Sequence, residues 1–449
     1  MRRAVAPLLA LTVALVLADS AIVTLALPDI LLNLDTTVAQ VAWVLISFNL
    51  VLGLLAVPTA LVSFRAQPRI LGAVGIAVFA AASAWCAVAQ SIEVLILARC
   101  LQAVGGALAL VGCLELLVAA YGERRGITTW IAAGVIGTAA GPVAGGLLTQ
   151  AISWQAIFVV QVPFAVLAVP AALSVRAGPP PMPDQARHRP AVRPNLTLAL
   201  LSAALTAALF LLVLLLVDGW GHSPAVAAVT VSVVALAALG ARPLVRWLRT
   251  PAEVEIAVGC FLMAGGLAGL ALLPSASLGW TIAPQALIGL GLGMTIDQLT
   301  LQAMHLRLPR VEHASWTIGA RHLGVVVGLA ILTPIFTADL QDAQTPAEQA
   351  ITGLVLDAPL PAQDKIELAR ALGDLLEHQR GEVPDLHDAF AATDVAAVYS
   401  PALAELEADL DDQIERAATF AFRDSFLAGA GLALLALVVL LVPPRRRAS

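Results

Sequence analysis

Five ionisable residues interrupt apolar stretches that are long enough to cross a bilayer: Asp19, Arg99, Glu115, Asp297 and Arg321. A charge in the hydrocarbon core is unfavourable by several kcal/mol unless it pairs with another group or faces a cavity. The chemistry open to these side chains is therefore ion pairing, proton transfer and the binding of a charged ligand.

Asp19 and Arg99 form the combination best suited to proton transfer. Asp19 lies nine residues before Pro28, and Arg99 lies eight residues after Ser91, which are the expected outer ends of their helices. At about 1.5 Å of rise per residue, both lie about 12 to 14 Å below the outer surface. They can meet only if the first and fourth spans are neighbours. A carboxylate beside a guanidinium keeps its charge, and one that loses this partner in apolar surroundings binds a proton. The alternatives are a proton relay and a permanent ion pair that fastens two helices.

Glu115, Asp297 and Arg321 lie in the inner third of their stretches. A central cavity open to the cytoplasm would expose Glu115 and Asp297 to protons or to a cationic substrate. For Glu115 the alternative is a carboxylate that reaches water at the inner headgroups. We interpret His322, next to Arg321, as a hydrogen-bond donor in helix packing.

The composition indicates a membrane protein. Of 449 residues, 59% are hydrophobic and 12% are charged, and the mean hydropathy is +0.89, whereas soluble domains carry roughly 25% charged residues. The four cysteines lie in apolar runs without a CxxC pair or metal-ligand spacing. Nucleotide-binding glycine motifs and HExxH are absent from the sequence. We therefore expect no enzyme activity, cofactor, metal site or nucleic-acid partner.

Twelve stretches are long enough to cross a hydrocarbon core of about 30 Å, which requires about 20 apolar residues. They lie near residues 5–27, 41–63, 70–90, 92–120, 127–149, 154–175, 196–217, 224–248, 254–274, 278–304, 314–337 and 425–442. Arginines gather in alternate connections, which the positive-inside rule assigns to the cytoplasm. We predict an all-α polytopic protein of the inner (plasma) membrane, with two six-helix bundles and both termini cytoplasmic.

Composition divides the chain into five regions. We predict an N-terminal transmembrane bundle at 1–176, a Pro-rich, basic cytoplasmic linker at 177–195, and the first five helices of a C-terminal bundle at 196–337. An acidic, helical extracytoplasmic insertion at 338–424 precedes the last transmembrane helix and a basic cytoplasmic tail at 425–449.

The insertion is the largest segment expected outside the membrane. It holds 19 acidic and 5 basic residues, a net charge of −14. Thr345-Pro346 and Ser400-Pro401 predict helix starts, and Ile366, Ala369, Leu372 and Leu376 predict a buried stripe. We interpret the acidic faces as solvated surfaces repelled by anionic lipids. The alternative is a cap over an exit path or a docking site for a cell-envelope partner.

The fifth stretch is rich in small residues. It reads GVIGTAAGPVAGG from Gly134 and contains Gly137, Gly141, Pro142, Gly145 and Gly146. Small residues let helix backbones approach closely, and a proline permits a bend. This pattern predicts a tightly packed helix that can flex.

These stretches together resemble the major facilitator superfamily, in particular its drug:proton antiporter branch with fourteen spans. The fifth stretch is similar to the antiporter signature of that superfamily. Leu17 to Pro28 (LADSAIVTLALP) resembles the first-span motif of the branch and puts its acid at Asp19. Leu95 to Ala107 (LILARCLQAVGGA) resembles the fourth-span motif, which puts its buried arginine at Arg99 and its glutamine at Gln102.

The resemblance implies a proton-coupled secondary transporter that exports small apolar or amphipathic compounds, drug-like or lipid-like, by alternating access. Protons would enter at Asp19 and Arg99, and Gln102 joins Glu115, Asp297 and Arg321 as a residue expected at the cavity or substrate. The partners implied are the bilayer, protons and a small-molecule substrate.

Two features depart from the family pattern. The inner loop after the second span reads TALVSFRA from Thr59, with Ser63 where the family has an acid. The chain also has twelve expected spans rather than fourteen, so spans seven and eight belong either to the second bundle or to an extra pair. The loop supports an alternative function, a transport-inactive membrane scaffold or sensor that acts through the acidic outer region.

Overall fold

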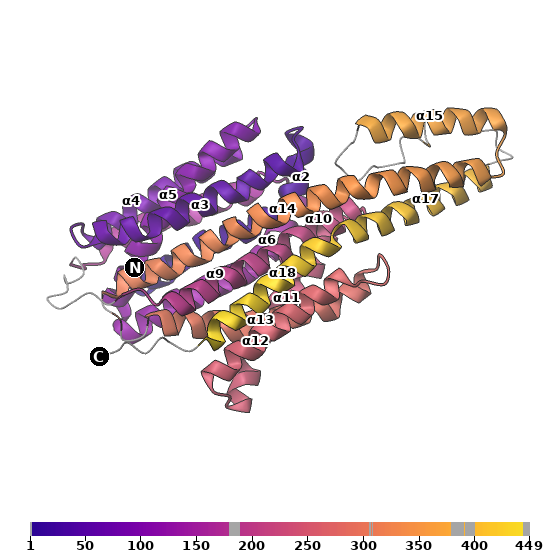
Figure 1. Ribbon diagram of the computed structural model, residues 1–449. Coiled ribbons are helices and arrows are strands. Elements are labelled where there is room, and N and C mark those ends of the chain that lie inside the picture. Colours follow the sequence, from indigo (N-terminus) through magenta and orange to yellow (C-terminus); the bar gives the residue numbers. More distant parts are fainter. Residues whose placement is uncertain are drawn as a thin grey trace.

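Helices account for every regular element in the part of the chain that the structure describes, as predicted from the sequence. The structure is a computed structural model and describes residues 2–178, 189–304, 307, 309–378, 390 and 400–442. Most of the predicted linker (residues 179–188) and the basic tail from residue 443 onward lie outside these ranges. Both termini lie at one end of a bundle of long helices, hereafter the terminal end (Figure 1). A helical arm, formed by residues 341–378 and 400–421, projects from the opposite end.

The first half of the chain forms eight helices. They are α1 (Arg2–Thr24), α2 (Leu27–Asn33), α3 (Val38–Ser63), α4 (Pro68–Ala87), α5 (Ile92–Tyr121), α6 (Glu123–Ala151), α7 (Ala156–Val159) and α8 (Gln161–Ser174). Side-chain caps fix two of their starts, because Thr37 accepts from the Gln40 amide and Ser91 from the Val94 amide.

The second half contains one interrupted helix, several continuous ones and the arm. Its elements are α9 (Val192–Thr206), η1 (Ala207–Leu211), α10 (Leu212–Leu214), η2 (Leu215–Gly219), α11 (Pro224–Leu248), α12 (Ala252–Ala271), α13 (Leu278–Met304), α14 (Arg310–Asp357), α15 (Ala362–His378), α17 (Ser400–Ala421) and α18 (Arg423–Leu441). The segments η1 and η2 are π-helical. This form is rare in proteins, and where it occurs it is often part of a functional site.

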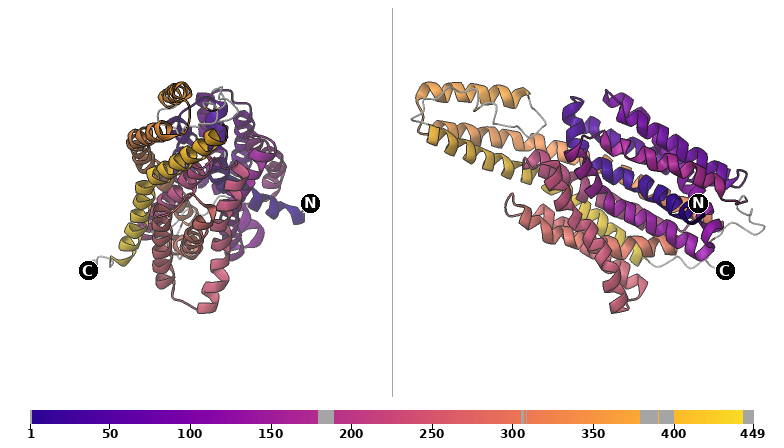
Figure 2. Two further views of the ribbon diagram at one scale, coloured as in Figure 1. Left: turned by 90° about the vertical axis from the view of Figure 1, so that its right-hand side faces the viewer. Right: turned by 180° about the vertical axis from the view of Figure 1, so that it is seen from behind.

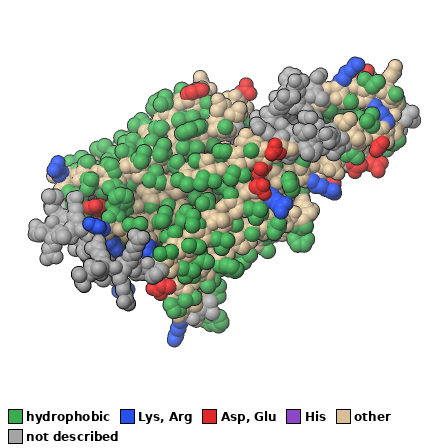
Figure 3. All heavy atoms as spheres, viewed as in Figure 1, with side chains coloured by type: hydrophobic (Ala, Val, Ile, Leu, Met, Phe, Trp, Pro, Cys, Tyr) green, Lys and Arg blue, Asp and Glu red, His purple; other side chains and the backbone are tan. Residues whose placement is uncertain are grey.

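Eleven helical stretches of the described chain are long and apolar enough to cross a membrane, judged by length and composition. The twelfth predicted span, residues 278–304, is α13, which has the predicted bounds and packs against α11 and α12. It is not among the eleven, and it buries the polar residues Thr281, Gln285 and Thr295. Hydrophobic side chains cover most of the bundle face in Figure 3, and charged side chains gather toward its ends and on the arm.

The two halves of the bundle meet along two helix pairs. Within the first half, α1 packs on α6 and α4 on α5; within the second, α9 packs on α14 and α18, and α12 on α13. Contacts between the halves run mainly between α3 and α14 and between α6 and α11. Figure 2 shows the resulting bundle along its length and from behind.

The arm corrects two predictions from the sequence. Helix α14 runs for 48 residues without a break through Thr345-Pro346, where a helix start was expected. The local capping signal was outweighed by packing of α14 against α17. On α15, Leu372 is buried in the arm's core as predicted, but Ile366 (51% exposed) and Ala369 are exposed and Leu368 is buried in their place, because the neighbouring helices set which face is buried. The side chain of Leu376 lies outside the described residues. Helix α17 is described from Ser400 to Ala421; residues 391–399 lie outside the described residues, so the helix start at Ser400-Pro401 stays a prediction.

Three glycines of α6 form a stripe against α1. A methyl group added at Gly137 would overlap the Ala14 carbonyl oxygen, and one at Gly145 would overlap that of Ile22. At Gly141 it would lie 2.9 Å from the Ala21 methyl group. The stripe therefore lets α1 pack directly on the backbone of α6, on either side of Asp19.

We expect Gly145→Ala to lower the apparent unfolding temperature of the purified protein in detergent. The added methyl group meets backbone atoms, and overpacking of this kind is unfavourable by about 1–3 kcal/mol. Gly265→Ala on α12 is the matched control, because nothing lies within 4 Å of its added methyl group. Equal unfolding temperatures for the two variants would contradict the close contact between α1 and α6.

Candidate functional site

The ion pair between Asp19 and Arg99 lies at the centre of the candidate site. Asp19 on α1 and Arg99 on α5 are both fully buried, and Asp19 Oδ2 accepts a hydrogen bond from Arg99 Nη1. The structure thus brings together the two residues whose depths matched in the sequence. A pair removed from water in this way is stable only if its other donors and acceptors are also satisfied.

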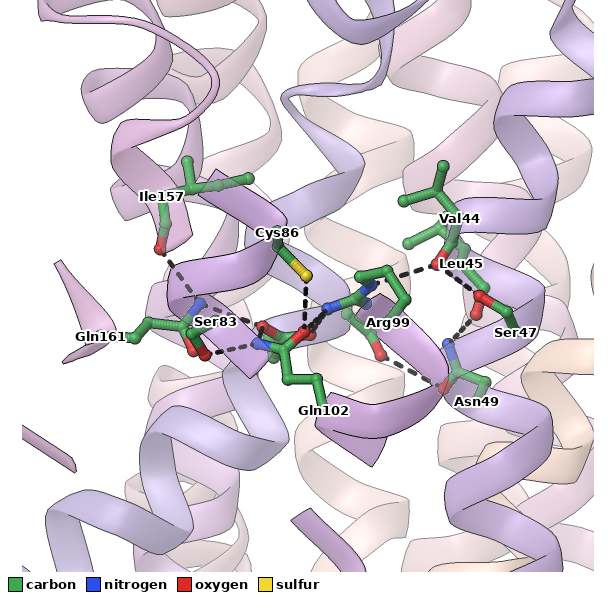
Figure 4. A network of polar contacts seen from close by, with 12 residues as sticks. Val44, Leu45, Ser47, Asn49, Ser83, Cys86, Arg99, Gln102, Ile157 and Gln161 are labelled. Atoms are coloured by element: carbon green, nitrogen blue, oxygen red, sulfur yellow. Dashed lines mark hydrogen bonds and ion pairs between the residues drawn. The ribbon is translucent and has the colours of Figure 1, made fainter. Parts of the chain in front are cut away.

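Two glutamines satisfy the second oxygen of the carboxylate. Asp19 Oδ1 accepts from Gln102 Nε2 at 3.1 Å and from Gln161 Nε2 at 3.0 Å. Gln102 also donates to Ser83 Oγ at 2.9 Å and accepts from Arg99 Nη1 at 2.6 Å. Figure 4 shows these side chains converging from several helices. The carboxylate therefore accepts hydrogen bonds from three side chains.

Arg99 has partners besides Asp19. Its Nε donates to the Val44 carbonyl oxygen on α3 at 3.2 Å, and its guanidinium carbon lies 4.2 Å from the centre of the Phe48 ring and 5.7 Å from that of Phe158. A cation over an aromatic face gains electrostatic stabilisation. The guanidinium could therefore keep several contacts if the carboxylate became neutral.

A cavity of about 90 Å³ lies beside this network, between the two halves of the bundle. Its walls come from helices of both halves. The lining residues are Leu17, Ser20, Ala21, Thr24, Leu45, Asn49, Thr138, Leu198, Leu201, Ser202, Leu205, Thr206, Leu209, Phe210, Leu292, Ile296, Arg321, His322 and Val325. Most are apolar, and the π-helical η1 contributes Leu209 and Phe210.

A polar contact crosses the cavity between the halves. Asn49 Oδ1 on α3 lies 2.7 Å from His322 Nδ1 on α14 and accepts from Ser20 Oγ at 3.2 Å. The Asn49 amide nitrogen donates to the Leu45 carbonyl, which fixes Oδ1 as an acceptor. His322 Nδ1 must therefore be the donor. The contact links the residue next to Asp19 to the second half.

Arg321 alone of the four residues expected at the cavity or substrate lines the central cavity. Gln102 is fully buried in the Asp19 network. Asp297 pairs with Arg242 and lines a separate cavity of about 290 Å³ between α6 and helices α11 to α13. Helix rise predicts how far along its helix Asp297 lies, but not which face of the helix its side chain occupies.

Glu115 also lies outside the central cavity, in an ion-pair cluster between the two halves. Arg310, the first residue of α14, is 3.3 Å from Glu115 on α5 and 2.7 Å from Glu123 at the start of α6. Glu115 therefore has a protein partner rather than only headgroup water, contrary to the alternative from the sequence. The cluster joins the first and second halves at the start of α14.

Sequence reasoning missed several members of the site. Gln161, Ser83 and Asn49 were not predicted, although each is a polar residue within a strongly apolar stretch. His322 was interpreted as a packing donor and does donate in this way, but across the cavity. Among the described residues, no three His, Cys, Asp or Glu side chains come close enough to hold a metal ion.

We expect Asp19→Leu and Arg99→Leu each to lower the apparent unfolding temperature more than the double variant does. Either single change leaves a buried charge without its partner, a loss of about 3–5 kcal/mol, whereas removing both charges avoids that penalty. The exposed Asp412–Arg416 pair on α17 is the control, since such pairs contribute only about 0.3–0.5 kcal/mol. Additive effects of Asp19→Leu and Arg99→Leu would contradict the buried ion pair.

Solved structures of other proteins share this fold. A bacterial homologue of the human lysosomal transporter Spinster, in an inward-facing and occupied conformation, has a similar fold, with a TM-score of 0.63, 16% identity, and coverage of 98% of this chain and 96% of that chain. Its inward-facing, unoccupied form gives a TM-score of 0.60 at 15% identity, with coverage of 98% of both chains.

Relatives in sequence carry resistance or efflux names. The methylenomycin A resistance protein of Streptomyces coelicolor is 28% identical over 382 residues, which cover 76% of this chain and 78% of that protein. The multidrug efflux pump LfrA of Mycolicibacterium smegmatis is 35% identical over 159 residues, 34% of this chain and 32% of that protein. Residues 9–333 match the sequence pattern of the Major Facilitator Superfamily. The chain belongs to the Major Facilitator Superfamily.

Proposed function

We propose that this protein is a proton-coupled secondary transporter that exports small apolar or amphipathic compounds by alternating access. The observation that carries the proposal is the buried Asp19–Arg99 pair beside a cavity between the two halves. The resistance and efflux names of its relatives support the direction of transport.

Protonation of Asp19 is the proposed coupling step. A proton on its carboxyl group removes the charge that Arg99 binds, while Gln102, the Val44 carbonyl and two aromatic rings remain as partners of Arg99. The carboxyl group would then be free to shift with α1. Helix α1 packs on the glycine stripe of α6, and Gly146 of α6 packs on Ala228 of α11. A shift of α1 would therefore move α6 and change the contact between the two halves.

Alternating access requires the halves to rock about the central cavity. We propose residues 1–176 as one moving body and residues 196–337 with the last helix as the other, joined by the linker at 177–195. Helices α9 and α11 pack within the second half, which supports assigning spans seven and eight to it. The ion pairs of Arg310 with Glu115 and Glu123 would hold the terminal end closed. They would replace the family's loop acid, whose position is taken by Ser63 in this chain.

The proposed orientation puts the terminal end in the cytoplasm of a cell with an inner (plasma) membrane. Arginines follow or precede the helices at that end, as the positive-inside rule requires of cytoplasmic segments. The arm, which includes most of the acidic residues 338–424, would then be extracytoplasmic.

We expect Asp19→Asn to reduce proton-driven efflux at least tenfold. The assay follows accumulation of a panel of amphipathic fluorescent dyes in everted membrane vesicles, where the cytoplasmic face is outward. The amide keeps the shape of the side chain but cannot carry the proton. An uncoupler should abolish wild-type accumulation, and Asp412→Asn on the arm should leave it unchanged. Gradient-independent flux, or no flux from folded wild-type protein, would refute the proposal; absence of flux is what the scaffold alternative predicts.

We expect Arg310→Gln to open the terminal end more often. Losing an ion pair worth about 1 kcal/mol changes a two-state ratio about fivefold. A cysteine at Ser202, which lines the cavity, reports access in a variant whose four native cysteines are replaced by serine. A membrane-impermeant thiol reagent should label it severalfold faster in everted vesicles when Arg310→Gln is present. Arg416→Gln is the charge-matched control, and an equal labelling rate would contradict the gate.

A further inference from the structure

We propose that the central cavity selects compounds that carry an anionic group, such as a carboxylate, phosphate or sulfonate, and that Arg321 binds this group. The inference rests on the proposed export function and names its substrate class. Arg321 contributes the one permanently charged side chain to the described cavity lining, and neither Asp nor Glu is part of that lining.

The state of Arg321 differs from that of Arg99, Arg242 and Arg310, which lie in or at the ends of the spans. Arg99 pairs with Asp19, Arg242 with Asp297, and Arg310 with Glu115 and Glu123. Arg321, by contrast, makes no hydrogen bond or ion pair with the described residues, although it is partly buried on α14. A guanidinium at membrane depth without a counter-ion is unfavourable by several kcal/mol. A ligand anion would supply the missing partner.

Asp297 does not act as the counter-ion that Arg321 lacks. Its charge acts on Arg321 through space, but its carboxylate is bound by Arg242 and lines the other cavity. The positive charge of Arg321 is therefore left facing the cavity, where guanidinium geometry suits two-point binding of a carboxylate, phosphate or sulfonate.

The rest of the lining suits an apolar body attached to that anion. Leucines of α9 and the π-helical Phe210 form one wall, and Ser202 and Thr206 offer hydroxyl groups. The cavity of about 90 Å³ is smaller than the roughly 300–1,000 Å³ of sites for drug-sized ligands. The halves must therefore separate to admit such a molecule. The neutral groups of the lining would not compensate for the positive charge of Arg321.

Two probes that differ chiefly in a sulfonate test the inference. 8-Anilinonaphthalene-1-sulfonate is anionic, and N-phenyl-1-naphthylamine is its neutral counterpart. Binding of each is measured at equilibrium to the full chain in nanodiscs, after subtraction of empty nanodiscs. We expect Arg321→Gln to weaken binding of the sulfonate at least tenfold, about 1.4 kcal/mol, and to change binding of the neutral probe less than twofold. Arg321→Lys, which keeps the charge, should retain most of the affinity for the sulfonate.

The controls separate this inference from the export proposal. Arg416→Gln on the arm should change neither affinity. Equal weakening of both probes by Arg321→Gln, or a wild-type preference for the neutral probe, would overturn the inference. Charge-selective binding without gradient-driven export would refute the export proposal alone, and gradient-driven export with binding indifferent to the sulfonate would refute the substrate class alone.

Discussion

The exclusion of water from a single ion pair is the constraint on which the rest of this structure depends. Asp19 and Arg99 are fully buried on different helices, and a buried pair is tolerable only when nearly every donor and acceptor around it is used. The glutamines on α5 and α8, the serine on α4 and the carbonyl on α3 meet most of that requirement, whereas Arg99 Nη2 and Gln161 Oε1 are buried without a hydrogen-bond partner among the described residues. Five helices of the first half are thereby fixed around one carboxylate.

The glycines of α6 also help to position Asp19, because they contact the helix that carries it. They allow α1 to lie against another backbone at Gly137 and Gly145, which determines where Asp19 stands. Gly146 turns to the second half and packs against Ala228. One small-residue helix thus contacts both the element that carries the acid and the element across the interface, so its local packing is coupled to the relation between the halves.

The sequence allowed the helical class, the membrane spans and the equal depths of Asp19 and Arg99 to be predicted, because hydropathy and helix rise fix depth along each helix. Their meeting depended on α1 and α5 being neighbours, which depth does not determine. It did not reveal which face of a helix a side chain occupies. Asp297, Glu115 and Arg321 have similar depths, yet only Arg321 lines the central cavity. The partners Arg242 and Arg310 lie far away in the chain, and such pairings follow from helix packing that depth alone does not specify.

The length of α14 has a mechanical consequence. One unbroken helix of 48 residues, about 72 Å at 1.5 Å per residue, carries Arg310 at its first turn, Arg321 and His322 at the cavity, and the arm at its far end. A rigid rod that pivots near its middle moves its two tips in opposite directions. If α14 tilts when the halves rock, the arm works as a lever whose position reports the occupancy of a cavity that the described arm residues do not line.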